Sequence, residues 1–205
     1  MTSLRSGVKL GLMKKLSTYL FLILFSFSPP SFADDISDFE IEGISIGDNV
    51  SEFFTEMQII QNTVKYHTNN NKFITLEFNN LDFFKTYGAL QLAYKSENKI
   101  IKSITGLMPY KYNIEDCYEK MDMVINDILN SINVIDKTDK IVQKLRQDSS
   151  GKSEMTIVEL YFDSGYCQIG CYNWSDEKGW TDNLRVTIRT NEFDKWSEEN
   201  LITKN

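Results

Sequence analysis

Three cysteines, Cys117, Cys167 and Cys171, are the residues of this sequence whose type and spacing could do the most chemistry. A thiol can form a disulfide, bind a metal or act as a nucleophile, depending on its partners. A catalytic thiol needs a base, and the only imidazole in the sequence is that of His67. Because His67 lies in a polar stretch, 65–71, that is typical of a solvated loop, the sequence favours structural cysteines over catalytic ones.

The spacing of the cysteines favours one disulfide. Cys167 and Cys171 fall on the same side of a predicted strand, where four residue steps separate their Cα atoms by about 13 Å, and a disulfide tolerates only about 7 Å. Cys117 lies on the apolar face of a predicted helix that can pack on a strand. We expect a Cys117–Cys171 disulfide, with Cys117–Cys167 as the alternative and a buried thiol left over. The same spacing argues against a zinc site shared with His67.

Acidic residues show no catalytic or metal-binding pattern. The stretch 34–42 is rich in carboxylates but lacks the fixed spacing of a calcium loop, so we expect it to be solvated; its acids are Asp34, Asp35, Asp38, Glu40 and Glu42. The sequence contains no nucleophile elbow, phosphate-binding glycine loop or dinucleotide fingerprint. We therefore predict no catalytic residue, no metal and no cofactor.

An aromatic group occupies one short region, with Tyr172, Trp174 and Trp180 close together in the sequence. Packing of most of these side chains in the core is the favoured interpretation. The alternative is an exposed aromatic surface that binds a partner protein or a sugar.

The first 33 residues have the pattern of an export signal. Four cations precede an apolar run at 16–27 that is too short for a stable membrane span, and Pro29-Pro30 ends this run. Ser31-Phe32-Ala33 then provides small residues for cleavage after Ala33. We expect a periplasmic or secreted protein, with translation starting at Met1 or at Met13; an uncleaved membrane anchor is the alternative.

The charge balance disfavours two classes of partner. The sequence has 29 acidic and 22 basic residues, a net charge of −7, and all the acids follow residue 33. Because no cluster of Lys and Arg stands out to neutralise phosphates, binding of nucleic acid or anionic lipid is not expected. After residue 33 no stretch is long and apolar enough to span a membrane, so the mature chain should be soluble.

The remaining residues, 34–205, predict a single α+β domain. Asn113 can cap a long amphipathic helix at 114–132, and alternating apolar residues predict strands in two groups, 73–78, 89–94 and 100–107, then 155–162, 166–174 and 184–188. Shorter helices are expected at 48–57 and 191–201, an extended segment at 39–46 and a long loop at 136–152. A helix followed by three antiparallel strands thus occurs twice. We expect two such halves, 34–112 and 113–205, to pack together, although no convincing residue-level repeat links them.

Four motifs resemble a group of small exported proteins from AT-rich marine alphaproteobacteria. They are Ile41-Glu-Gly-Ile-Ser-Ile-Gly-Asp48, Asn113-Ile-Glu-Asp-Cys-Tyr118, Cys171-Tyr-Asn-Trp-Ser175 and Leu184-Arg-Val-Thr-Ile188. This resemblance spans most of the mature chain and implies export but no particular activity. In architecture, the Ile-Gly-Asp turn followed by a helix and antiparallel strands is also similar to β-lactamase-inhibitor proteins and to outer-membrane-assembly lipoproteins.

These observations favour a non-enzymatic interaction module whose partner is a protein of the cell envelope. Either a sheet face or the loop that carries Trp174 and Trp180 would provide the binding surface. One alternative is a hydrolase that acts on envelope material through carboxylates brought together only by the fold. Such an enzyme requires a concave pocket with carboxyl groups of raised pKa. The other alternative is a small-ligand binding protein.

Overall fold

The computed structural model describes residues 36–66, 71–79, 81–111 and 113–200, which belong to one compact unit, Ala33–Asn205. The predicted signal segment, Asp34, Asp35 and His67 lie outside the described residues. In chain order the elements are η1 (Ile36–Asp38), β1 (Glu40–Ile41), β2 (Ile44–Ser45), η2 (Val50–Glu52), α2 (Glu56–Gln61), β3 (Thr63–Val64), β4 (Phe73–Asn79), β5 (Ala89–Lys95), β6 (Ile101–Pro109), α3 (Ile114–Ser131), β7 (Asp136–Lys137), β8 (Ile141–Lys144), β9 (Glu154–Phe162), β10 (Gly165–Asn173), β11 (Asn183–Thr190) and α4 (Asn191–Asn200).

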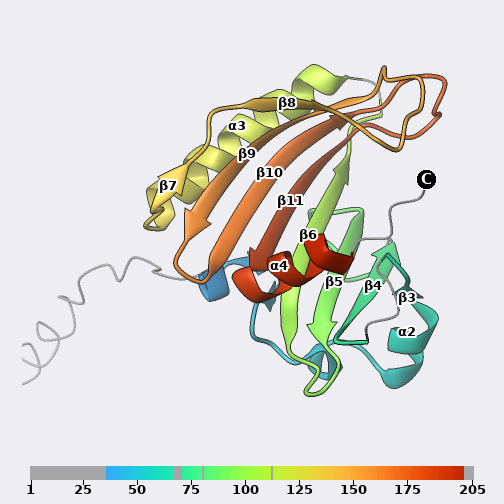
Figure 1. Cartoon of the computed structure of the whole chain (residues 1–205), viewed down its shortest axis with the longest axis vertical. Coiled ribbons are helices and arrows are strands. Elements are labelled where there is room, and N and C mark those ends of the chain that lie inside the picture. The colour runs from blue at the N-terminus through green and yellow to red at the C-terminus, as the bar shows by residue number, and fades with distance from the viewer. Residues whose placement is uncertain (1–35, 67–70, 80, 112, 201–205) are drawn as a thin grey trace, which may run out of the picture. The chain divides into compact units, whose positions relative to one another are not determined.

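A nine-stranded antiparallel sheet organises this unit (Figure 1). Its order is β3-β4-β5-β6-β11-β10-β9-β7, and β8 pairs with β9 at the same edge as β7. The strands of the two predicted halves therefore belong to one sheet, which is joined where β6 pairs with β11. Helices and sheet together confirm the predicted α+β class.

Helix α3 covers one face of the sheet, against β10 and β11. Asn113 caps it as predicted, because its side-chain oxygen accepts a hydrogen bond from the Glu115 backbone N–H at 3.1 Å. The buried helix residues are those at helical spacing, Cys117, Met121, Ile125 and Ile128. They pack on side chains from alternate positions of the strands, which form the main hydrophobic core.

The N-terminal segment covers the other part of this same face. Its buried side chains join the same core as β4, β5 and β6, and they include Ile36, Ile41, Ile44, Val50 and Phe54. Phe54 stacks on Phe78 of β4 with ring centroids 4.0 Å apart. Glu42, in the turn between β1 and β2, accepts hydrogen bonds from the backbone N–H groups of Lys85, Thr86 and Tyr87 at 2.7–2.8 Å. Glu42 is thus an anchor for a loop and not part of a solvated acidic segment.

Several local predictions were wrong. The segment 39–46 is a hairpin, β1–β2, because Glu42 and Gly43 adopt positive φ in its turn. The helix predicted at 48–57 is two short helices, η2 and α2, each with its own cap, Asn49 and Thr55. The predicted loop 136–152 contributes β7 and β8, which are only two and four residues long and mostly exposed, so neither shows the sustained apolar alternation of a buried strand.

Candidate interaction face

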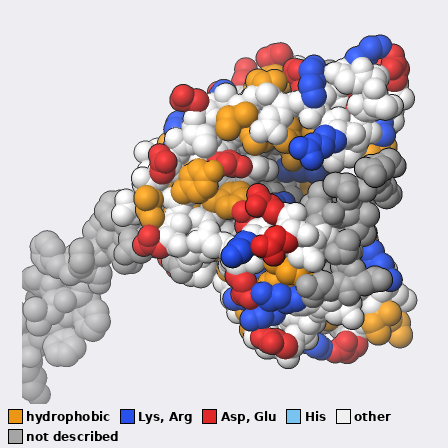
Figure 2. All heavy atoms as spheres, viewed as in Figure 1, with side chains coloured by type: hydrophobic (Ala, Val, Ile, Leu, Met, Phe, Trp, Pro, Cys, Tyr) orange, Lys and Arg blue, Asp and Glu red, His pale blue; other side chains and the backbone are white. Residues whose placement is uncertain are grey.

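The surface of the sheet opposite α3 is a candidate functional site, and we call it the polar face. Helix α4 lies on it, in front of the strands in Figure 1. Figure 2 shows the molecule from this side, with acidic and basic side chains gathered around α4 and the surface hollowed beside it. The strands place polar side chains here because the alternate positions point to the apolar core under α3.

Six side chains of the polar face line up across six neighbouring strands, and we call them the polar row. In sheet order they are Glu77 (β4), Gln91 (β5), Thr105 (β6), Thr187 (β11), Gln168 (β10) and Glu159 (β9), each directly opposite the next. The order Glu-Gln-Thr is thus followed by Thr-Gln-Glu. The row therefore reads the same from either end. Its two central residues lie on β6 and β11, the paired strands that join the two predicted halves.

Hydrogen bonds connect the first part of the polar row. The Gln91 side-chain amide donates to Glu77 Oε2 at 3.2 Å, and the Tyr66 hydroxyl donates to the same oxygen. Partial burial of the phenol, together with the bond to the Glu77 carboxylate, raises the pKa of Tyr66 to about 12. Tyr66 therefore stays protonated and keeps donating well above neutral pH.

The last part of the polar row repeats this arrangement. The Gln168 amide donates to Glu159 Oε1 at 2.8 Å, and the Tyr161 hydroxyl donates to Glu159 Oε2 at 2.5 Å. The hydrogen bond to Glu159, followed by desolvation, raises the pKa of Tyr161 to about 12. Each end of the row thus consists of one carboxylate held between one tyrosine and one glutamine.

The centre of the polar row is a buried pair of hydroxyls. Thr105 and Thr187 are 7% and 4% exposed, and their Oγ1 atoms lie 3.0 Å apart. Tyr66 and Tyr161, which donate hydrogen bonds to the carboxylates at the two ends of the row, are 43% and 37% exposed. The row therefore runs from accessible ends to a covered centre.

Helix α4 borders the polar row on one side. Phe193 and Trp196 of α4 pack with Phe73 and Ala93 of the sheet, and Asp194 accepts a hydrogen bond from the Tyr166 hydroxyl at 2.7 Å. Ala93 and Tyr166 belong to the row of sheet positions next to the polar row. Glu192 of α4 also forms ion pairs with Lys72 and Lys95, which hold the helix to the start of β4 and to β5. The short helix predicted at 191–201 is thus confirmed as α4, which buries Phe193 and Trp196.

An aromatic group borders the polar face at its other end, and it contains the residues singled out in the sequence. Tyr172 lies on the polar face, where the Arg185 guanidinium stacks over its ring at 3.9 Å. Trp174 is buried at 8% exposure and packs edge-on against Trp180 at 4.6 Å, whereas Trp180 is 51% exposed. We call Tyr172, Trp174 and Trp180 the aromatic corner. Within this group Trp174 is packed in the interior, whereas Trp180 is accessible to a partner.

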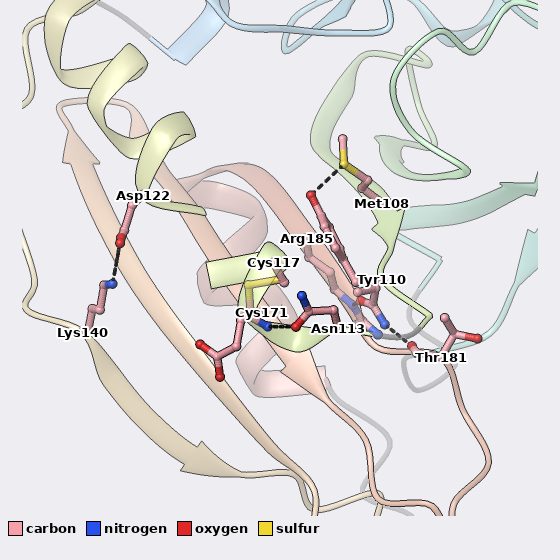
Figure 3. Close-up of a disulfide and its surroundings, with 11 residues drawn as sticks. Met108, Tyr110, Asn113, Cys117, Asp122, Lys140, Cys171, Thr181 and Arg185 are labelled. Carbon is pink, nitrogen blue, oxygen red and sulfur yellow. Dashed lines mark hydrogen bonds and ion pairs between the residues drawn. A yellow bond between two sulfur atoms is a disulfide. The ribbon is translucent and has the colours of Figure 1, made fainter. Parts of the chain in front are cut away.

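The cysteines are structural, as expected. Cys117 and Cys171 form the predicted disulfide, with Cα atoms 6.0 Å apart, and so join the first turn of α3 to β10 (Figure 3). Cys167 is the free, buried thiol. Burial raises the pKa of Cys167 to about 12, so its nucleophilic thiolate form is scarce at neutral pH. In the described part of the chain no group of three or more His, Cys, Asp or Glu side chains could hold a metal ion.

Asp148 is the acidic residue with the most hydrogen-bond donors around it. Its carboxylate accepts from the Ser153 hydroxyl at 2.6 Å, from the Ser175 hydroxyl at 2.8 Å and from the backbone N–H groups of Ser150 and Ser153 at 2.9 Å. These hydrogen bonds, first that of Ser153, hold the pKa of Asp148 far below its usual range. The carboxylate thereby fixes the loop between β8 and β9 to the segment that follows β10.

A cavity of about 430 Å³ lies on the other side of the sheet, between α3 and the segment that links β7 to β8. Its lining comprises Asp122, Ile125, Asn126, Lys137, Thr138, Asp139, Lys140 and Val158. The Lys140 ammonium forms an ion pair with the Asp122 carboxylate at 2.7 Å and so ties the segment to the helix (Figure 3).

The polar row was missed in the sequence, although a signal for it exists. Gly88-Ala-Leu-Gln91-Leu-Ala93 in β5 resembles Gly165-Tyr-Cys-Gln168-Ile-Gly170 in β10, with glutamine at the same place. Leu76-Glu77-Phe78 likewise resembles Val158-Glu159-Leu160, and Ile104-Thr105 resembles Val186-Thr187. The connections between these strands differ in length, so a search for a repeat at one fixed period does not align these segments.

Comparison with known protein families, with curated proteins and with solved structures finds no match to this chain. None of the described helices is long and apolar enough to cross a membrane.

Proposed function

We propose that the protein is an exported, non-enzymatic interaction module that binds a partner protein of the cell envelope on its polar face. The observation that carries the proposal is the polar row. It aligns donors and acceptors from six strands and holds them through side-chain hydrogen bonds before any partner arrives. A surface ordered in this way loses little side-chain entropy on binding, which favours affinity.

The aromatic corner gives the proposed surface an anchor. Trp180 is exposed, and the Lys178 ammonium lies 4.4 Å from the centre of its ring. Exposed tryptophan and tyrosine side chains supply large contact areas, and they are enriched among the residues that dominate binding energies. The polar row and the aromatic corner would therefore act as one surface.

Export is part of the proposal. The first 33 residues have the pattern of a cleavable export signal. The Cys117–Cys171 disulfide is of the kind that persists in oxidising compartments such as the periplasm or the extracellular space.

We further propose that the folded unit consists of two halves of similar design, 34–112 and 113–205. The sheet order supports this proposal, because β4, β5 and β6 occur on one side of the β6–β11 pair in the same sequence as β9, β10 and β11 on the other. Each half then contributes one tyrosine, one glutamate, one glutamine and one threonine to the polar face. A partner would meet two equivalent binding elements in opposite orientation.

A hydrolase is less well supported. A carboxyl group that donates a proton at neutral pH needs a raised pKa. The described carboxyl groups with a shifted pKa, Glu42, Asp148 and Glu192, all have a lowered pKa because hydrogen bonds to the carboxylates outweigh the effect of desolvation.

Affinity capture tests the proposal. The tagged protein is chemically cross-linked in the cells that produce it, and the captured proteins are compared with those of a Gln91→Ala, Gln168→Ala variant and of a Trp180→Ala variant. We expect a specific envelope protein that the Gln91, Gln168 variant loses and that Trp180→Ala weakens. Asn130→Ala, on the exposed side of α3, is the matched control and should retain it. A partner kept at full yield by both face variants would contradict the proposal.

A further inference from the structure

Neither carboxylate of the polar row has a cationic partner within the part of the chain that the structure describes. Each accepts hydrogen bonds from neutral groups, Tyr66 and Gln91 at Glu77, Tyr161 and Gln168 at Glu159. No Lys or Arg among the described residues forms an ion pair with either of them. Glu192, which also lies on this side of the sheet, contrasts with them because it pairs with two lysines.

Each of these carboxylates can accept further hydrogen bonds. A carboxylate has about four acceptor positions, and the donors found here occupy two of them at each residue. At Glu77 both donors lie on Oε2, so Oε1 has no described donor. The side chains of Glu77 and Glu159 are neither buried nor fully exposed, and an ion pair in such a setting is less screened by water than one at the surface.

The positions of the two charges set a spacing. Five strand-to-strand steps separate β4 from β9, which corresponds to about 24 Å along the sheet at roughly 4.8 Å per step. Arg185, one row away on β11, is held by Asn183 at 2.9 Å and by the Tyr172 ring. Its positive charge also acts on Tyr66 at the Glu77 end of the row, so the spacing of the two carboxylates, and not this cation, sets where basic side chains would bind.

We infer that the polar face binds a protein segment with two basic side chains, one paired with Glu77 and the other with Glu159. This inference rests on the proposed function and names the chemistry of its partner. An extended segment rises about 3.3 Å per residue, so basic residues about seven positions apart would reach both carboxylates. The acidic charge of the whole protein, −7, would add long-range attraction for such a partner.

Synthetic peptides test the inference directly. The probes are glycine- and serine-based peptides of equal length that carry two arginines separated by different distances, together with a peptide that carries a single arginine. We expect the peptide with arginines about seven residues apart to bind about two- to fivefold more tightly than the single-arginine peptide. The double variant Glu77→Gln, Glu159→Gln should remove this advantage, and each single variant should remove part of it.

Glu119→Gln is the control, because it removes the same charge from an exposed position on α3 and should leave binding unchanged. The inference is overturned if the double variant binds the two-arginine peptide as the wild type does, or if arginine spacing has no effect. An envelope partner captured through Gln91 and Gln168 but indifferent to the double glutamate variant would overturn this inference while leaving the proposed function standing.

Discussion

At the level of single residues, the hydrogen bond between Thr105 and Thr187 makes each of these threonines depend on the other. Thr105 and Thr187 face each other at the centre, where their hydroxyls are buried and 3.0 Å apart. A buried hydroxyl that loses its partner loses a hydrogen bond without regaining one from water. The two residues should therefore behave as a unit.

Substitution of Thr187 by valine, which has the same shape, should lower the free energy of unfolding by about 1–3 kcal/mol. The Thr105→Val, Thr187→Val double variant should cost less than the sum of the two single variants, because neither hydroxyl is then left behind. Urea unfolding of the four proteins of this cycle measures the coupling. Strict additivity would show that the two hydroxyls do not depend on each other.

Asp148 predicts a pH dependence of stability. Its pKa is lowered in the folded protein by the hydrogen bonds from Ser153, Ser150 and Ser175. A lowered pKa stabilises the fold above the pKa of the unfolded chain, and this stabilisation is lost as the pH falls through the unfolded value toward the folded one. The Asp148→Asn variant should therefore have a lower urea midpoint than the wild type at pH 7, and the difference should shrink below about pH 4.

Asp163→Asn is the control for this experiment, because Asp163 is exposed in the turn between β9 and β10. Its midpoint should follow that of the wild type throughout. A difference between Asp148→Asn and the wild type that stays constant down to pH 2.5 would mean that the carboxylate charge does not stabilise this loop.

At the scale of elements, the disulfide holds α3 to the sheet. It links residues 54 positions apart, at the start of α3 and near the end of β10. Closing a loop of that length in the unfolded chain corresponds to about 4 kcal/mol in the chain-entropy account. The helix also buries four side chains against the strands, so its packing does not depend on the disulfide alone.

Reduction of the disulfide should accordingly lower the free energy of unfolding by about 3–5 kcal/mol, and the reduced protein should keep its helix signal in far-ultraviolet circular dichroism at low temperature. Cys167→Ala is the control, because it keeps the disulfide and should show the same loss on reduction. Equal stability of the oxidised and reduced wild type would contradict a stabilising role for this link.

Residue patterns predicted the strongly periodic elements well. Alternating apolar residues located β4, β5, β9 and β11, and helical spacing with an asparagine cap located α3. The position of Cys117 on the apolar face of that helix, with the strand spacing of Cys167 and Cys171, favoured the disulfide that the structure contains, although Cys117–Cys167 stayed open as the alternative. The short strands β3, β7 and β8 were missed because they are fixed by pairing with longer strands and not by their own sequence.

The candidate site was harder to predict. Alternation places Glu77 and Gln168 on the outer side of their strands, but only the pairing of β6 with β11 brings the two sets of polar residues into one row. That pairing joins segments far apart in the chain, and one sequence does not specify it. The fold of this unit thus brings into one row residues that look in the sequence like an ordinary solvated strand face.

At the scale of the whole molecule, we propose that the polar face receives a partner protein. The most direct test is site-specific photo-cross-linking, with benzoylphenylalanine placed at Gln91 or at Gln168 on the polar face and at Glu119 on α3. We expect the same envelope protein to be cross-linked from both glutamine positions and not from Glu119. Cross-linking of a partner from Glu119 alone, with none from Gln91 and Gln168 in folded variants, would contradict this proposal.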